Sequence, residues 1–215
     1  MALRLQRCSP RGRRATPRSP LVEFQLDTRE VKHMSPHILS VAVLSAGTSG
    51  QGSEALWRAY QERALIVRPH LTCRDLRSLL QGFAEGAVRD AAFLQDLVAE
   101  RAWDRGGAAS GRDLCSIAAS LARLKFRDEA VFGGLAARVL DAEAEPPFAA
   151  LAELVSALAQ VSCRQPALLQ AAAARLGERL QAPPAELSPA VAASTLHALA
   201  LCSHCDAALS ELFVA

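Results

Sequence analysis

Apolar residues recur at intervals of three and four positions along most of the chain. The clearest example lies in two successive segments near the middle: Leu114, Ile117, Leu121 and Leu124, and then Val131, Leu135 and Val139. Residues at this spacing lie on one face of an α-helix, whereas apolar residues alternate in a half-buried strand. The pattern therefore predicts two amphipathic helices that are joined by a short turn.

This two-helix pattern is repeated. The segment TCRDLRSLLQGFAEGAVRDAAFL (72–94) matches SGRDLCSIAASLARLKFRDEAVF (110–132), which gives a period of about 38 residues. The apolar positions return after about 37 residues more and again after about 41 residues, where the loop QAPPAELSP accounts for the longer step. Nearer the N-terminus, LWRAYQERA (56–64) matches LQDLVAERA (94–102), again about 38 residues apart. This match adds one further unit at the start of the series, in which the pattern is less well preserved. We therefore predict five units, near 36–66, 72–104, 110–142, 147–181 and 188–215.

Helix-start signals recur in phase with the apolar pattern. The predicted first helices begin after one N-cap position, which is occupied by Thr72, Ser110, Pro147 and Ser188. Asp75 and Asp113 follow two of these caps at the spacing of a capping box. The predicted second helices begin after Asp90, Asp128 and Asp206. The Gly- and Ser-rich segment SAGTSGQGS (45–53) is expected to be the loop inside the first unit.

A pair of short helices cannot bury its apolar face alone, but stacked pairs share a continuous core. Apolar residues make up 51% of the chain and aromatic residues only 5%, and the apolar set is mostly Ala and Leu, which favours helices. The predicted fold class is all-α, an α-solenoid of stacked helical hairpins over residues 35–215 with about 37–41 residues per unit. No apolar run reaches the roughly 18 residues that span a bilayer, so no membrane partner is predicted.

The first 20 residues, MALRLQRCSPRGRRATPRSP, differ from the rest. They contain six arginines and no Asp or Glu, while the remainder of the chain carries 18 basic and 22 acidic side chains. An Arg-rich, acid-free segment without an apolar core is typical of an organellar transit peptide; a disordered basic arm is the alternative. We predict that residues 1–34 are such a leader. The predicted location is the mitochondrial matrix, with the plastid as the alternative.

Taken together, these features resemble a known group of proteins. Units of about 37–38 residues, Ala/Leu-rich first helices, Arg-Asp before the second helices and an Arg-rich leader are similar to organellar helical-repeat proteins. These are the octotricopeptide and heptatricopeptide repeat proteins and the Fas-activated serine/threonine kinase-like mitochondrial family, whose members often end in a RAP domain. The resemblance covers residues 36–215. It implies a role in organellar RNA processing, stability or translation, or a place in the mitochondrial ribosome.

Two features depart from this group. The chain ends at ELFVA, so we expect no RAP domain and no nuclease activity of the kind associated with one. The octotricopeptide run of prolines that ends in Glu-Trp is also missing, and APPAE at 182–186 is only a faint echo of it.

RNA binding by such repeats needs cations at one position of successive units, because phosphates repeat along a strand. One turn position meets this demand, with Arg89, Arg127 and Arg164. Arg123 and Lys125 add positive charge beside it. These five residues are candidate phosphate contacts. Alternatively, each turn arginine pairs with the neighbouring cap aspartate or lies in solvent, where an ion pair contributes little.

Polar residues along the first helices form a second candidate set. One column contains Ser40, Ser78, Ser116, Glu153 and Ser194, and the neighbouring column contains Gln81, Ala119, Ser156 and His197. Short polar side chains in such columns can contact base edges of a single strand. Small residues at these positions can also serve close packing of neighbouring helices. The candidate base contacts are Ser78, Ser116, Gln81 and His197.

Other chemistry finds little support. The six cysteines are widely spaced and no secretory signal precedes them, so we expect free thiols. CSHC at 202–205 lacks the four ligands of a structural zinc site, and Cys202 falls on an apolar repeat position, which favours core packing. No phosphate-binding Gly loop, helical His-Glu pair or Gly-x-Ser-x-Gly motif is present. We predict no enzyme activity, cofactor, metal or small-molecule substrate; a metal-dependent enzyme is the third alternative.

The leading hypothesis is therefore a mitochondrial repeat protein that binds single-stranded RNA, alone or with protein partners in a ribonucleoprotein or mitoribosome assembly. Because the chain after the leader is acidic, we expect a narrow RNA footprint. The alternative is an armadillo- or HEAT-like protein-interaction scaffold without direct RNA contact. A basic stripe on the concave face would favour RNA, and an apolar or acidic groove would favour the scaffold.

Overall fold

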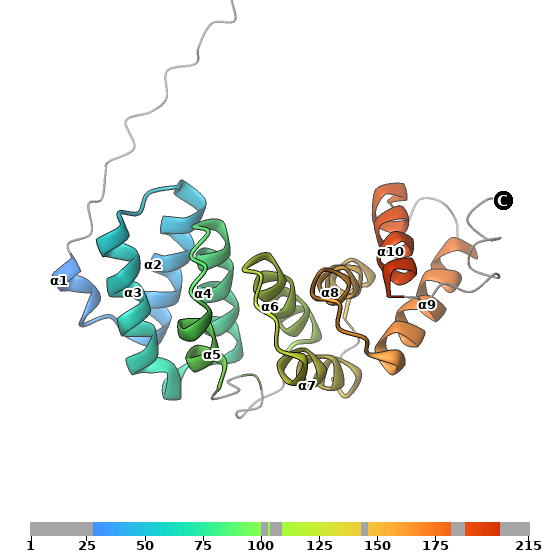
Figure 1. Ribbon diagram of the computed structural model, residues 1–215, viewed down its shortest axis with the longest axis horizontal. Helices are drawn as coiled ribbons and strands as arrows, with labels where there is room; N and C mark the ends of the chain where they lie inside the picture. Colours follow the sequence, from blue (N-terminus) through green and yellow to red (C-terminus); the bar gives the residue numbers. More distant parts are fainter. Residues whose placement is uncertain (1–27, 100–102, 104–108, 143–145, 182–187, 203–215) are drawn as a thin grey trace, which may run out of the picture.

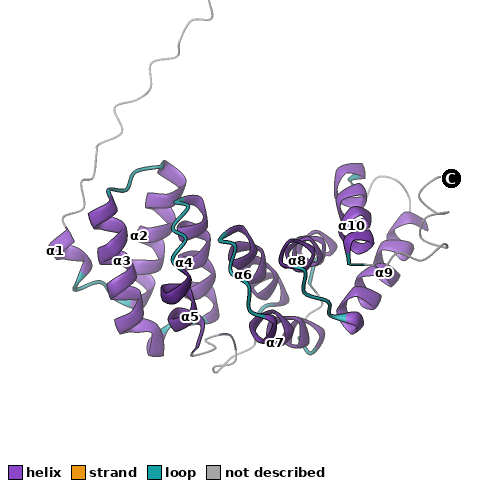
Figure 2. Ribbon diagram, viewed as in Figure 1, coloured by secondary structure: helices purple, strands orange, loops and turns teal. Residues whose placement is uncertain are grey.

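The computed structural model describes residues 28–99, 103, 109–142, 146–181 and 188–202. Within these ranges the regular structure is helical and no strand occurs (Figure 2). The predicted all-α class is confirmed. Residues 1–27 of the predicted leader, and His204, Cys205 and Asp206, lie outside the described residues. Residues 28–34, which the predicted leader also includes, are instead part of the helical structure: they contain α1 (Thr28–Val31), and Val31 and Met34 are buried in the core.

The helices follow one another in pairs. After the short α1 (Thr28–Val31), the first helices of the units are α2 (Pro36–Ser49), α4 (Cys73–Glu85), α6 (Gly111–Arg123), α8 (Phe148–Val161) and α10 (Pro189–Leu201). The second helices are α3 (Glu54–Val67), α5 (Ala91–Ala99), α7 (Glu129–Leu140) and α9 (Pro166–Gln181). A 3₁₀ turn, η1 (Arg68–His70), follows α3.

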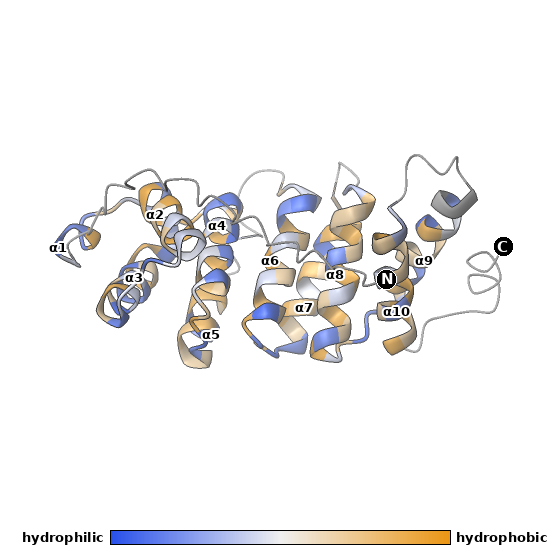
Figure 3. Cartoon of the chain, turned by 90° about the horizontal axis from the view of Figure 1, so that it is seen from above, coloured by the Kyte–Doolittle hydropathy of each residue, from blue (hydrophilic) through white to orange (hydrophobic). Residues whose placement is uncertain are grey.

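The first helices pack against one another in chain order, α2 on α4, α4 on α6, α6 on α8 and α8 on α10. The second helices α3, α7 and α9 pack against their own first helices, and α3 also contacts α5 as α7 contacts α9. Phe93 of α5 meets Phe83 of α4 in an edge-on ring contact. Figure 1 shows this sequence of helices running from α1 at one end to α9 and α10 at the other. Each helix carries hydrophobic and hydrophilic residues side by side (Figure 3). The buried core lies between the two sets of helices and is dominated by Leu, Ala, Val and Phe.

The caps fix the register of the units. The first helices begin after Ser35, Thr72, Ser110, Pro147 and Ser188, so one unit follows another at about 37–41 residues. The interval from Ser35 to Thr72 is one residue shorter than the interval from Thr72 to Ser110. The match of LWRAYQERA to LQDLVAERA, which assumes the longer interval, is therefore one residue out of register. For the same reason Val41, not Ser40, is the counterpart of Ser78.

The predicted cap positions among the described residues all precede helices, but only three of the six, Thr72, Asp90 and Asp128, accept a cap hydrogen bond. The Thr72 hydroxyl accepts from the Asp75 N–H at 3.2 Å, and the Asp75 carboxylate accepts from the Thr72 N–H at 3.3 Å, which completes a capping box. Asp90 and Asp128 accept from the N–H groups of Phe93 and Val131.

The second predicted capping box is wrong. Ser110 precedes α6 but its side chain makes no cap hydrogen bond. Asp113 instead accepts from Arg77 of α4 at 2.6 Å. An ion pair to the neighbouring helix has thus replaced a local cap. Ser188 likewise precedes α10 without a side-chain cap hydrogen bond.

The prediction of a loop over 45–53 is also wrong in its first half, because α2 continues to Ser49. Gly47 is buried against α4, where a Cβ added to it would lie 2.3 Å from the carbonyl oxygen of Gly82. Close packing of two helices at these glycines therefore outweighs the low helix propensity of the Gly/Ser-rich sequence. Gly50 then ends α2 with φ 66°.

The first helices end in one type of turn. Ala87, Lys125 and Ser162 follow α4, α6 and α8 with φ between 53° and 60°, in the left-handed region. The next N–H in each turn donates back five residues, from Val88 to Phe83, from Phe126 to Leu121 and from Cys163 to Leu158, at 2.9–3.0 Å. This hydrogen bond is that of a Schellman motif, in which glycine is the usual left-handed residue. Among the described turns that follow first helices, only the turn after α2 has that glycine.

We therefore expect Ala87→Gly to stabilise the protein by about 0.5–1 kcal/mol, because glycine relieves the left-handed strain that alanine carries. The matched control is Ala137→Gly, at an exposed position inside α7, which should destabilise by about 1 kcal/mol. Urea unfolding followed by circular dichroism measures both changes. A lower free energy of unfolding for Ala87→Gly would contradict the assigned turn.

Among the described residues, no helix is both long enough and apolar enough to cross a bilayer.

Candidate nucleic-acid interface

The outward side of each first helix carries four residues at spacings of four, three and four, which places them on one helical face. These residues are His37, Val41, Leu44 and Thr48 on α2; Arg74, Ser78, Gln81 and Glu85 on α4; Arg112, Ser116, Ala119 and Arg123 on α6; Ala149, Glu153, Ser156 and Gln160 on α8; and Ala190, Ser194, His197 and Leu201 on α10. All of them are exposed or half-buried. We call this surface the first-helix face.

The sequence-predicted polar columns lie on this face with one exception. Ser78, Ser116, Gln81 and His197 come from three different helices and all belong to it. Ser40 does not, because it is 1% exposed and its hydroxyl donates to the His37 carbonyl at 2.8 Å and to Asp75 at 3.3 Å. The one-residue shift of the first interval explains this error.

A groove crosses the first-helix face between α4 and α6 and extends to Glu153 of α8. Its volume is about 560 Å³. Its lining is mainly polar and consists of Arg77, Gln81, Arg112, Ser116, Ala119, Ser120, Arg123 and Glu153. Donor groups of arginine, serine and glutamine thus surround a space that is open to solvent.

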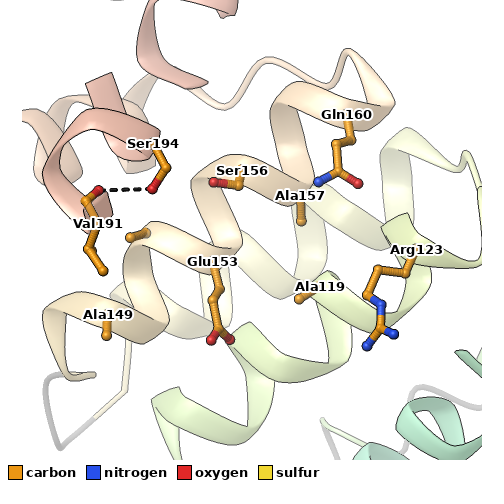
Figure 4. A pocket seen from close by; sticks show the side chains of 10 residues that line it. Ala119, Arg123, Ala149, Glu153, Ser156, Ala157, Gln160, Val191 and Ser194 are labelled. Atoms are coloured by element: carbon orange, nitrogen blue, oxygen red, sulfur yellow. Dashed lines mark hydrogen bonds between the residues drawn. The ribbon is translucent and has the colours of Figure 1, made fainter. Parts of the chain in front are cut away.

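A second hollow adjoins the first. It lies between α6, α8 and α10 and has a volume of about 250 Å³ (Figure 4). Its apolar lining consists of Ala119, Ala149, Ala152, Ala157 and Val191, and its polar lining of Arg123, Glu153, Ser156, Gln160 and Ser194. Ala119, Arg123 and Glu153 line both spaces, so the groove and the hollow are continuous along the first-helix face.

Two ion pairs link neighbouring first helices at this surface. Arg77 of α4 donates to Asp113 of α6, and both side chains are largely buried. Arg123 of α6 donates to Glu85 of α4 at 3.0 Å, and this hydrogen bond together with the arginine charge holds the pKa of Glu85 below its usual value. The Arg77 Nε is buried without a hydrogen-bond partner among the described residues. These contacts hold the arginine side chains in place along the groove.

Arg112 differs from these two arginines. It is exposed, lines the groove, and makes no side-chain hydrogen bond or ion pair with another described residue. Glu153 likewise makes no ion pair within the described ranges. Among the described residues that line the groove, Arg112 and Glu153 are therefore a cation and a carboxylate that are available to a ligand.

The turn arginines lie at the edge of this surface. Arg89, Arg127 and Arg164 are exposed in the turns after α4, α6 and α8, and none of them lines the groove or the hollow. Lys125 is exposed in the turn directly after α6, next to Arg123. The cap aspartates beside Arg89 and Arg127 accept from backbone N–H groups, and Asp128 also accepts from the Gln95 side chain. The structure thus places these cations beside the first-helix face but outside its two concave spaces.

Sequence reasoning missed three arginines of the site: Arg74, Arg112 and Arg77. The signal for the first two was present, because Arg-Asp-Leu occurs at 74–76 and again at 112–114. The leucine of each triplet is buried, so the arginine two positions earlier on the helix points outward. Arg77 had no comparable signal, since its counterparts Cys115 and Ala152 are apolar.

The cysteine thiols near this surface are unreactive. Cys73, Cys115, Cys163 and Cys202 are free, as predicted, and Cys202 is buried in the core. Burial, and then the charge of Glu153, raises the pKa of Cys115 to about 12. Burial followed by the charge of Asp113 raises the pKa of Cys73 to about 11. Thiols with such pKa values stay protonated at neutral pH and are poor nucleophiles. No group of three or more potential metal ligands occurs within the described part of the chain.

No protein-family model matches this sequence, and no curated protein is significantly similar to it. The function is therefore argued from the geometry and charge of the first-helix face.

Proposed function

We propose that the helices form an α-solenoid of stacked hairpins that binds single-stranded RNA on the first-helix face. The cellular role that we propose is mitochondrial RNA processing, stability or translation, alone or with protein partners in a ribonucleoprotein assembly. The observation that carries this proposal is the concentration of cations on and beside α4 and α6: Arg74, Arg112, Arg123, Lys125 and Arg127.

The repetition of one structural unit supports the solenoid. Caps and left-handed turns return at a regular interval of about 37–38 residues. The main contacts all join elements that are one or two apart in chain order. Helices in contact lie about 8–10 Å apart. Arg74 and Arg112, at equivalent positions of α4 and α6, therefore present positive charge at about this interval, which suits a repeating phosphate backbone.

Donors next to the arginines support a nucleic-acid ligand. Ser116 and Gln81 line the polar groove together with Arg112, and such side chains can bond to phosphate, sugar or base edges. The cationic part is confined to two units, so a short stretch of single strand would be contacted. This confinement agrees with the acidic balance of the chain after its first 20 residues.

The mitochondrial location rests on the leader and on the resemblance to organellar repeat proteins; the plastid is the alternative. Residues 1–27 of the leader lie outside the described residues. Their six arginines would also bind RNA without specificity, so any binding assay needs a chain that lacks residues 1–27 alongside the full chain.

We expect both forms of the chain to bind a fluorescein-labelled single-stranded RNA, with an affinity that falls as salt is raised. Arg74→Ala combined with Arg112→Ala should weaken binding, and should reduce the slope of log K against log salt by about 1.4, or about 0.7 per phosphate contact. Fluorescence anisotropy at four salt concentrations measures both quantities.

The matched control is Lys32→Ala with Arg58→Ala, which removes the same charge near α1 and α3 and should leave the slope unchanged. If neither form of the chain shows salt-sensitive binding, RNA is not the ligand.

A protein-interaction scaffold is the second candidate, and the α2 end of the first-helix face favours it. Ile38 and Val41 are 56% and 53% exposed there, and the half-buried Leu44 lies on the same face. An apolar segment of a partner protein could cover this end. Ile38→Ser with Val41→Ser would abolish partner capture from organelles in that case, while RNA affinity would stay unchanged.

A further inference from the structure

Building on the RNA binding proposed above, we propose that the hollow between α6, α8 and α10 holds one nucleobase and selects guanine, with Glu153 and Arg123 as the selecting residues. Glu153 accepts from the Watson–Crick edge of the base, and Arg123 donates to its O6 and N7.

The shape of the hollow suits a planar, mostly apolar group. Its volume of about 250 Å³ is set by the small side chains of Ala119, Ala149, Ala152 and Ala157, with Val191 at one side. Bases that leave a stack are commonly held against apolar or aromatic side chains. A methyl-lined surface of this kind provides contact area for the face of a base without any preference among the four.

The preference for one base comes from the polar side chains around the apolar lining of the hollow. Figure 4 shows Ala119 between Glu153, which projects from α8, and Arg123, which projects from α6. A carboxylate, which only accepts hydrogen bonds, thus stands on one side and a guanidinium, which only donates them, on the other. The ligand must offer donors toward the first and acceptors toward the second.

Guanine offers both sets. Its N1–H and N2–H₂ groups are adjacent donors that fit the two oxygens of a carboxylate, and its O6 and N7 are adjacent acceptors that fit a bidentate arginine. Adenine combines N6–H₂ with the acceptors N1 and N7, cytosine has one donor group, and uracil has a single N–H. None of these three presents paired donors and paired acceptors together.

The existing contacts of Arg123 leave the required edge available. Only its Nη1 donates to Glu85, at 3.0 Å, so the edge formed by Nε and Nη2 remains for the base. Glu85 thereby orients the guanidinium while staying outside the hollow. At the rim of the hollow, the Ser194 hydroxyl donates to the Val191 carbonyl at 3.0 Å. The Ser194 oxygen can therefore still accept a hydrogen bond from a sugar hydroxyl.

The charge of Glu153 gives a second, independent argument. An exposed carboxylate without an ion-pair partner among the described residues repels a polyanion that binds beside it. A specific donor pair on the ligand would offset this repulsion for one base only. The carboxylate therefore weakens binding of RNA in general and favours strands that place guanine in the hollow.

The test measures dissociation constants of the full chain for a labelled all-uridine 9-mer RNA and for the same strand with one central guanosine, adenosine, cytidine or inosine. We expect the guanosine strand to bind at least tenfold more tightly than the others, and inosine, which lacks the N2 amino group, to lose most of that preference. Glu153→Gln should reduce the preference to less than threefold, while the all-uridine strand binds equally well or better. Glu129→Gln, which removes an exposed carboxylate on α7, is the matched control and should keep the full preference.

Each other outcome counts against the inference in a distinct way. Equal affinity for all of these strands would overturn guanine selection and leave the proposed function standing. Glu153→Gln tightening every strand with the guanine preference retained would show that the carboxylate only repels. Absence of binding to any strand would overturn both proposals. Binding of an arginine- or lysine-rich peptide that Glu153→Gln abolishes, without a guanine preference, would assign the hollow to a protein partner.

Discussion

Gly82→Val is expected to lower the free energy of unfolding by about 3 kcal/mol, the upper part of the usual range for overpacking. A Cβ added to Gly82 would lie 2.5 Å from the carbonyl oxygen of Val43 and 2.7 Å from the backbone nitrogen of Leu44. These are backbone atoms of α2 and cannot rotate away, so α2 must separate from α4. Gly82→Ala should give an intermediate loss, because its better helix propensity offsets about 1 kcal/mol.

The matched control is Gly134→Val, since nothing lies within 4 Å of a Cβ added to Gly134 in α7. It should be neutral or slightly stabilising, because valine is a better helix former than glycine. Urea unfolding measures the free energies, and hydrogen exchange locates the change. Equal effects of the two valine substitutions would contradict the close approach of α2 and α4.

Asp75→Ala is expected to cost about 3 kcal/mol, which combines about 1 kcal/mol for the cap with about 1–3 kcal/mol for buried donors left without partners. Asp75 is 7% exposed, and its carboxylate accepts from the Thr72 hydroxyl at 2.7 Å and from the Ser40 hydroxyl at 3.3 Å. It also lies 3.3 Å from the His37 imidazole, so one carboxylate caps α4 and ties it to α2. Asp96→Ala, at an exposed position of α5, is the control and should change stability by less than about 0.5 kcal/mol.

The same contacts predict a pH dependence. Burial raises the pKa of Asp75, but hydrogen bonds from Thr72, and then from His37 and Ser40, outweigh burial, so that the net pKa lies below the ordinary value. A carboxyl group with a depressed folded-state pKa stabilises the fold above its unfolded pKa of about 3.9, and this contribution is lost as the pH falls through the folded-state pKa. The stability difference between the wild type and Asp75→Ala should therefore shrink below about pH 4. An unchanged difference at about pH 3 would show that Asp75 carries no such linkage.

Much of the local structure could be predicted from the sequence, because it depends on neighbours in the chain. The helix starts at Thr72 and the N-caps at Asp90 and Asp128 follow from side chains that bond to the next turn. The errors concern distant partners. Asp113 bonds to Arg77 of the preceding helix, and the Gly-rich end of α2 is helical because α4 packs against it. Neither contact leaves a local signal.

The candidate site, too, has features that could be predicted from the sequence and features that could not. Periodicity placed Ser78, Ser116 and Gln81 on one surface, since helical spacing alone decides which residues share a face. The concave spaces could not be predicted, because they depend on small residues that meet across three helices, such as Ala119, Ala152 and Val191. The left-handed turns after α4, α6 and α8 were missed because alanine, lysine and serine stand where glycine would have signalled them.

The chain-order packing of these helices has a consequence for how the protein folds. Residues that touch across neighbouring units are separated by about the length of one unit, however many units the chain contains. Relative contact order is therefore low, and low contact order goes with fast folding. For the α-solenoid proposed above, we expect assembly to start at any pair of adjacent hairpins and to spread toward both ends, without a slow search for partners from remote parts of the chain.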